Sequence, residues 1–227
     1  MGNTIRDLSG AKYIEMSNGR FARQPSASVF ASGAWTKIRV ALYMDLFQIG
    51  SDVGSTPVFQ AGLCSGTTNI PGDATPTNAV GLNVTAASWS WYNGGGSSYI
   101  YNCGPCYPFK NVGGVLTNGT SSTPLLFATS AEANGLSAEL YVDITKGSPN
   151  YTVQAFCPTT VSPTTTEATF EAQSIASSPV IAGGHAFLTA QTIAFNESAG
   201  TLDSVFVYHK PTTGYARIKQ LRVVRLA

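Results

Sequence analysis

The stretch Trp35–Ile49, with the sequence WTKIRVALYMDLFQI, decides the fold class of this chain. Lys37, Arg39 and Asp45 share one parity, and apolar side chains occupy most of the other. Alternation with a period of two is typical of a strand with one buried face. A helix over Val40–Phe47 is the alternative, but the β-branched and aromatic residues, with glycine at both ends, favour the strand. We therefore predict a long strand here.

Shorter segments of the same kind recur along the rest of the chain. Turn-forming residues at Asn93–Gly96 and Thr145–Pro149 predict hairpins over 81–103 and 137–157. The further expected strands cover 58–64, 81–91, 98–101, 125–128, 137–144, 150–157, 168–175, 186–195, 204–209 and 215–226. In the last of them the alternation slips at Val223–Val224, which predicts a β-bulge or burial of both faces. The regular spacing of these strands predicts an antiparallel sandwich or barrel.

Composition limits the class of protein further. The chain has 227 residues, of which 11% are charged, against roughly 25% in an average soluble domain. Its apolar runs are shorter than the roughly 20 residues of a spanning helix, so we predict no membrane segment. Residues 1–20 lack the apolar core of a secretory signal, so we expect a protein that is made in the cytoplasm and does not leave by secretion. Because residues 1–34 are polar with weak periodicity, we predict an extended N-terminal arm or short edge strands there, followed by one β-domain over 35–227.

Charge is unevenly distributed, although the net charge is only +1. Residues 1–39 hold six basic and two acidic residues, and residues 210–225 hold five basic and no acidic residues. Residues 40–209 hold ten acidic and two basic residues. One interpretation is that the basic ends lie on the acidic body of the same or a neighbouring subunit. The other is nucleic-acid binding, which we disfavour because the basic residues alternate with apolar ones and no nucleic-acid motif accompanies them.

Aromatic residues are concentrated in one segment, since seven of the 24 lie within 89–109. If the hairpin turns about Gly95, Trp91 faces Tyr99 and Trp89 faces Tyr101 on one side of the sheet. Such a patch is either part of the core or an exposed platform for sugar rings or a protein partner, with hydrogen bonds from the turn. The candidate binding residues are Trp89, Trp91, Asn93, Tyr99 and Tyr101.

Cysteines offer two chemical interpretations and one structural interpretation. Cys103 and Cys106 have the Cys-x-x-Cys spacing of a redox site, but Pro108 and a glycine pair prevent the helix that such a thiol needs. A zinc site would need Cys64 and Cys157 as well, and two isolated cysteines are a weak signal for it. The remaining interpretation makes Cys64 and Cys157 small buried side chains near strand ends, with Cys103 and Cys106 in a loop, free or joined in a disulfide.

Catalytic groups for hydrolysis are not suitably spaced. Glu139 and Asp143 fall on one strand face about 13 Å apart, which exceeds the separation of roughly 5–10 Å between glycosidase carboxyls. The two histidines, His185 and His209, lie beside no nucleophile motif. We therefore predict no catalytic residue, no metal and no cofactor.

Two resemblances bear on function. Trp35–Ile49 followed by Val58–Leu63, and the strand Glu139–Ile144 with its turn, resemble the lectin-like (concanavalin A-like or LamG-like) jelly-roll sandwiches. That resemblance implies an all-β, antiparallel jelly-roll-type β-sandwich and a carbohydrate-binding role. The chain also resembles small virion proteins of tailed bacteriophages in its low content of charged residues, its richness in serine, threonine and glycine, and its polar arm.

The sequence therefore predicts a non-enzymatic structural protein, a bacteriophage head or tail component that assembles with itself or with neighbouring proteins in the virion. The alternative is a lectin-like, carbohydrate-binding module for host or glycan recognition. Neither a membrane nor a nucleic-acid partner is expected. The predicted assembly contacts are Arg6, Arg20, Arg23, Arg222 and Arg225.

Overall fold

The computed structural model describes most of the strand-forming chain. Its backbone is described over residues 4–8, 11–17, 21–25, 35–48, 57–65, 76–85, 92–93, 98–102, 106–121, 126–130, 136–147, 149–156, 170, 172, 175–176, 186–196, 201–209 and 215–227. Side chains are described over 35–43, 59–65, 76–85, 106–121, 139–147, 149–156, 170, 172, 175–176, 190–196, 201–208, 218 and 220–227.

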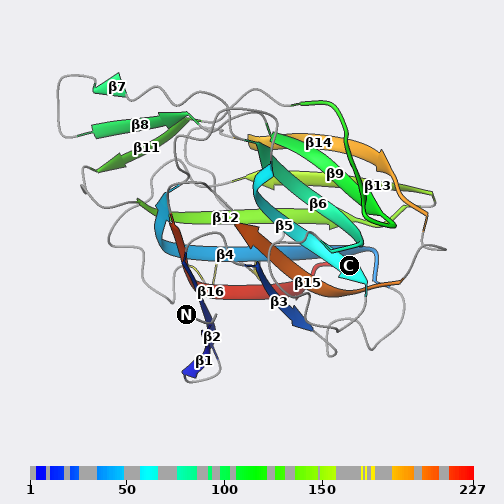
Figure 1. Ribbon diagram of the computed structural model, residues 1–227, viewed down its shortest axis with the longest axis horizontal. Coiled ribbons are helices and arrows are strands. Elements are labelled where there is room, and N and C mark those ends of the chain that lie inside the picture. The colour runs from blue at the N-terminus through cyan, green and yellow to red at the C-terminus, as the bar shows by residue number, and fades with distance from the viewer. Residues whose placement is uncertain are drawn as a thin grey trace.

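The fold is an all-β, antiparallel jelly-roll-type sandwich, as the sequence predicts (Figure 1). The seven-stranded sheet has the order β1 (Thr4–Leu8), β2 (Ala11–Ser17), β16 (Tyr215–Arg225), β4 (Lys37–Gln48), β12 (Leu136–Thr145), β13 (Asn150–Phe156) and β14 (Ala186–Ala194). The six-stranded sheet has the order β10 (Val115–Asn118), β9 (Cys106–Val112), β6 (Asn78–Thr85), β5 (Pro57–Ser65), β15 (Leu202–His209) and β3 (Phe21–Pro25). A further three-stranded sheet has the order β11 (Leu126–Ser130), β8 (Ser98–Asn102) and β7 (Tyr92–Asn93).

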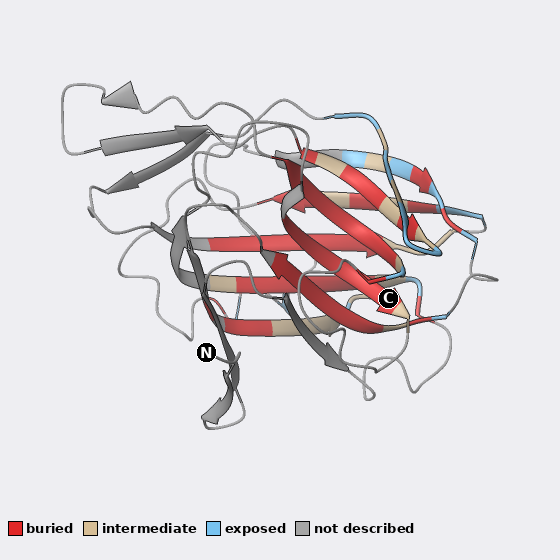
Figure 2. Ribbon diagram, viewed as in Figure 1, coloured by how far each residue is buried: buried red, intermediate tan, exposed pale blue. Residues whose placement is uncertain are grey.

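The main core lies between the two larger sheets, and most of the described residues on their central strands are buried (Figure 2). Ile38, Val40 and Leu42 of β4 belong to the same buried cluster as Leu63 of β5 and Leu82 of β6. Each of these side chains is at most 1% exposed. Every second residue of each of these strands therefore points into this core, as expected for sheets packed face to face.

The long first strand and the second hairpin are confirmed. β4 covers twelve of the residues predicted as a strand. β12 and β13 pair antiparallel with Thr145 opposite Thr152, so the predicted Thr145–Pro149 turn joins them. β4 pairs with β12 on one side and with β16 on the other, which places the C-terminal strand inside the sheet.

Some local predictions are wrong. The expected strand over 168–175 is helical at Phe170, Ala172 and Ile175. Phe170 is buried while Ala172 is exposed, and residues two apart on a strand would share one face. The β-bulge of β16 lies between Arg217 and Gln220 and not at Val223–Val224, where both valines are half-buried, so of the two predicted alternatives the bulge is wrong.

The loop predicted to hold Cys103 and Cys106 is wrong for Cys106, while Cys103 lies outside the described residues. Cys106 is the first residue of β9, and its side chain belongs to the main core. Cys64 near the end of β5 is buried, as predicted.

The segment 1–34 contributes backbone to both large sheets. β1 is the edge of the seven-stranded sheet, and β2 pairs with β16. β3 is the edge of the six-stranded sheet and pairs with β15. These pairings correspond to the edge-strand interpretation of the segment, while the division of the chain at residue 34 stays a prediction.

Candidate functional site

The outer face of the six-stranded sheet collects amide and aromatic side chains in register. Tyr208, Gln60, Asn83 and Tyr107 lie opposite one another on β15, β5, β6 and β9. The next rows along the strands contribute further residues of the same two kinds. We call this set the amide–aromatic face; its members are Gln60, Asn83, Asn111, Asn118, Tyr107, Phe109, Phe206 and Tyr208.

Two glycines form the centre of this face. Gly62 and Gly81 pair directly, with Phe206 on one side of them and Phe109 on the other. With no side chains between them, the two rings meet edge to face above the intervening strands, with centroids 6.0 Å apart. A Cβ on Gly62 would lie 2.7 Å from the Cα of Gly81 and would collide with the carbonyl oxygen of Val80. Glycine is therefore required here for the close approach of β5 and β6.

The amides of the face form a hydrogen-bonded line across the sheet. Gln60 Nε2 donates to Asn83 Oδ1 at 3.2 Å, and Asn83 Nδ2 donates to Asn118 Oδ1 at 2.9 Å. Gln60 and Asn83 are fully buried, whereas Asn118 is exposed. The line thus runs from the middle of the sheet to its edge strand β10.

One amide oxygen of the face has no hydrogen-bond partner. Asn111 is 2% exposed, and its Oδ1 accepts no hydrogen bond. Leaving a buried acceptor unsatisfied costs about 1–3 kcal/mol. Asn111 lies between Ala79 of β6 and Leu116 of β10 in the register. This oxygen is therefore buried without a hydrogen-bond partner among the described residues.

The edge strand β10 closes the face on one side. Its turn from β9 uses Gly113 and Gly114, with φ angles of 60° and 88°. Gly113 N donates to Asn78 Oδ1 at 3.0 Å, and Gly114 N donates to Thr77 O at 3.1 Å. Leu116 is half-buried against the cluster that contains Phe109 and Phe206. The turn is thus held in place while the strand beyond it stays largely exposed.

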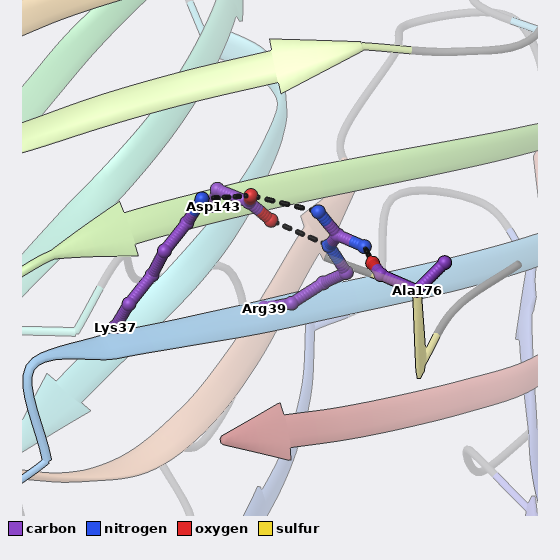
Figure 3. A network of polar contacts seen from close by, with 4 residues as sticks. All are labelled: Lys37, Arg39, Asp143 and Ala176. Atoms are coloured by element: carbon purple, nitrogen blue, oxygen red, sulfur yellow. Dashed lines mark hydrogen bonds and ion pairs between the residues drawn. The ribbon is translucent and has the colours of Figure 1, made fainter. Parts of the chain in front are cut away.

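The outer face of the seven-stranded sheet carries charged side chains instead (Figure 3). Arg39 of β4 donates through Nε and Nη2 to the two carboxylate oxygens of Asp143 on β12, at 2.6 and 2.8 Å. Lys37 Nζ lies 2.9 Å from Asp143 Oδ2. The Arg39 Nη1 donates to the carbonyl oxygen of Ala176. Arg39 and Asp143 are fully engaged by these contacts, which indicates a structural clamp.

An aromatic cluster beside this clamp packs against Phe170. The Tyr141 ring stacks on Phe156 and on Phe170, with centroids 5.7 and 6.2 Å away. Tyr43 also contacts the Phe170 ring, at 5.6 Å. The Arg39 guanidinium lies 5.1 Å from the centroid of the Phe156 ring, within the range of a cation–π contact. Phe170 and Ala176 together fasten their segment onto the outer face of the seven-stranded sheet.

The Tyr141 phenol donates to Glu139 Oε2 at 2.5 Å. Burial raises the pKa of Tyr141 far above its ordinary value of 10.0, and the hydrogen bond to Glu139 and its negative charge raise it further. Because the folded-state pKa is the higher one, the contribution of Tyr141 to stability is complete below pH 10 and falls as the pH rises above that value.

We expect the Tyr141→Phe variant to remove this part of the alkaline sensitivity. Above about pH 10, the free energy of unfolding of the wild type should fall more steeply than that of the variant, by about 1.4 kcal/mol per pH unit. Urea unfolding curves from pH 8 to pH 11 measure both slopes. Equal pH slopes for the wild type and the variant would contradict the assignment of this alkaline loss of stability to Tyr141.

The structure describes the backbone of the predicted aromatic hairpin in part. β7 and β8 are antiparallel, so a hairpin joins them, but Asn93 and not Trp91 lies opposite Tyr99. The register predicted from a turn at Gly95 is therefore wrong. Trp89 and Trp91 lie outside the described residues, and of Asn93, Tyr99 and Tyr101 only the backbone is described. Their role in binding stays a prediction.

The arginines predicted to make assembly contacts are not gathered in one place. Arg6 lies on β1 and Arg23 on β3, at edges of different sheets. Arg222 and Arg225 lie on β16, half-buried and exposed respectively. Arg20 is not among the described residues. Their contacts with other subunits stay a prediction. The pairing of Lys37 and Arg39 with Asp143 does show basic residues near the start of the chain meeting an acidic residue of the same chain.

The candidate chemical groups remain apart where the structure describes them. Glu139 and Asp143 lie on one face of β12, but each is engaged by a different partner, Tyr141 and Arg39. Within the described part of the chain, no group of three or more histidine, cysteine, aspartate or glutamate side chains is arranged to hold a metal ion. None of the helical residues described belongs to a helix long and apolar enough to cross a membrane.

The amide–aromatic face was missed in the sequence, although a signal for it exists. Tyr107, Phe109 and Asn111 occupy one parity of β9. Pro108 hides the pattern because proline ordinarily argues against a strand inside a sheet. The pairing of Gly62 with Gly81 depends on register and has no signal in either strand alone.

Comparisons with known proteins give structural likenesses only. No protein-family model and no curated protein sequence matches the chain. Peanut lectin with a nine-residue peptide is 12% identical to this chain, with a TM-score of 0.45. The match covers 98% of this chain and 90% of the lectin chain. The exoplasmic/lumenal domain of VIP36 in a Ca²⁺/Man3GlcNAc-bound form is 8% identical with a TM-score of 0.43, and covers 97% of this chain and 82% of its own.

An alginate lyase from Klebsiella pneumoniae is 8% identical with a TM-score of 0.34, and covers 96% of this chain and 75% of its own. At such low identities and TM-scores, these likenesses assign no function to the chain. The resemblance to bacteriophage virion proteins stays a prediction.

Proposed function

We propose that this chain is a non-enzymatic carbohydrate-binding module that holds a glycan on the amide–aromatic face. The observation that carries this proposal is the grouping of four amides and four aromatic rings on one sheet face, where one buried amide oxygen lacks a partner. It takes up the second of the two functions predicted from the sequence.

The chemistry of the face suits a sugar. Amide side chains donate and accept hydrogen bonds, which matches the hydroxyl groups of a saccharide. Aromatic rings offer apolar surface together with a polar edge, which suits the C–H faces of a sugar ring. A few placed polar groups within a mostly apolar lining are typical of small-molecule sites. The described side chains of the face include no carboxylate or imidazole, the groups that most often transfer protons in hydrolysis.

A glycan array followed by calorimetry tests this function. The wild type is expected to bind a defined set of glycans, and the Tyr107→Ala variant should bind them about tenfold or more weakly, because half-buried Tyr107 is the accessible ring of the face. Val115→Ala is the matched control, since Val115 is 69% exposed on the neighbouring strand and belongs to no row of the face. Absence of glycan binding by the wild type would contradict the proposal.

The aromatic hairpin is the competing location for the same function. A Trp91→Ala variant that loses binding while Tyr107→Ala retains it would move the site to β7 and β8. Assembly with copies of itself or with virion proteins, and a location in a virion, stay predictions from the sequence.

A further inference from the structure

The unpartnered oxygen of Asn111 indicates what the glycan must supply. Its Oδ1 is an acceptor that no group of the described residues satisfies, on a side chain only 2% exposed. Buried polar groups without partners are rare in native proteins because each one costs free energy. A ligand with a hydroxyl donor would remove that cost when it binds.

The surroundings of Asn111 on the same face are small and uncharged. Ala79 lies opposite Asn111 on one side, and Cys64 and Ser204 continue that row across the sheet. On the other side lies Leu116, which is only partly buried. Because Leu116 on the edge strand is the partly exposed neighbour of Asn111 while Ala79, Cys64 and Ser204 are buried, a ligand would have to reach Asn111 from the β10 side.

Charge excludes two other classes of ligand. Among the described side chains of the face, none carries a positive charge that would offset an acidic sugar, and burying an unpaired anion is costly. A calcium ion takes six to eight oxygen ligands, usually with carboxylates among them. The carboxylate of Asp203, which accepts a hydrogen bond from Ser204 Oγ at 3.0 Å, lies at the end of this row away from Asn111, and the described residues next to Asn111 add no second carboxylate.

We propose that the glycan bound by this face is an uncharged saccharide, that Asn111 Oδ1 accepts a hydrogen bond from one of its hydroxyl groups, and that binding requires no divalent cation. This inference rests on the proposed carbohydrate-binding function. It adds the ligand class, the independence from calcium and the role of one residue.

The test uses the full chain on an array that contains neutral glycans and acidic glycans, in buffer with EDTA and in buffer with calcium. Titration calorimetry with the best neutral glycan then compares the wild type with Asn111→Leu and Thr117→Ala. Thr117 is the matched control, because it lies on β10 with its side chain exposed and on the opposite parity to Leu116.

We expect the wild type to bind neutral glycans equally well with EDTA and with calcium. Asn111→Leu should bind about tenfold more weakly, while its melting temperature stays level or rises because an unsatisfied polar group has been removed. Thr117→Ala should bind like the wild type. A variant that keeps its melting temperature separates loss of binding from loss of folding.

Three results would overturn the inference. Binding that disappears in EDTA, or that is restricted to acidic glycans, would refute the ligand class while leaving the carbohydrate-binding function standing. Unchanged affinity in a folded Asn111→Leu would refute the role of this residue. No glycan binding by the wild type would refute the proposed function together with the inference.

Discussion

Replacing Asp143 with alanine is expected to lower the free energy of unfolding by about 3–5 kcal/mol. Arg39 is completely buried, and Asp143 is the carboxylate that holds its guanidinium through two hydrogen bonds. Without that carboxylate, the positive charge of Arg39 stays buried and loses the two charge-assisted hydrogen bonds that compensate it. Urea unfolding at constant pH measures the loss.

Two controls separate the charge effect from a simple loss of packing. Lys37→Ala should cost at most about 1 kcal/mol, because the Lys37 side chain is 30% exposed and water screens its ion pair. The double variant Arg39→Met/Asp143→Leu should be more stable than Asp143→Leu alone, because it leaves no unpaired buried charge. Equal stabilities for the double and single variants would show that the ion pair is not what makes Asp143 important.

Replacing Gly62 with alanine is expected to cost about 3 kcal/mol, the upper end of the usual range for overpacking. The added Cβ would collide with the backbone of β6, which cannot rotate away as a flexible side chain can. Relief would require β5 and β6 to separate, and the contact between the Phe109 and Phe206 rings above them would be disturbed. Thermal unfolding of the variant and the wild type compares the two stabilities.

Gly113→Ala is the matched control for the second prediction. A Cβ at Gly113 meets nothing within 4 Å, so its only penalty is the positive φ of 60°. That penalty is about 1 kcal/mol. If Gly62→Ala costs no more than Gly113→Ala, the close approach of β5 and β6 does not require glycine.

The two predictions concern opposite outer faces of the sandwich, which serve different purposes. The clamp of Arg39 and Asp143 fastens the segment of Phe170 and Ala176 to the seven-stranded sheet. The glycine pair shapes the amide–aromatic face of the six-stranded sheet. Substitutions in the clamp are therefore expected to lower stability alone. Substitution of the glycine pair is expected to lower stability and to weaken glycan binding.

Much of the fold was predictable because its strands are strongly patterned. β4 and β12 alternate so regularly that their buried parity can be read from either segment alone. The turn between β12 and β13 carries its own signal in Gly147 and Pro149. The strand predicted over 168–175 is wrong because a short segment with few large apolar residues suits a helical turn as well as a strand.

The candidate site was less predictable. The density of aromatic residues in 89–109 predicts a hairpin, but Phe109 at the end of that segment contacts Phe206 of β15, which is far away in the chain. Nothing near Asn111 distinguishes it from other asparagines until its neighbours on β6 and β10 are known.

Local alternation in the chain was enough to establish an all-β sandwich and to show which residues of β4, β12 and β13 face its core, because side-chain direction repeats every two residues within a strand. The pairing of Gly62 with Gly81, the burial of Arg39 beside Asp143 and the unpartnered oxygen of Asn111 emerged only with the folded sheets. Each of them depends on the register between strands distant in sequence, and that register is set by the packing of the whole sandwich.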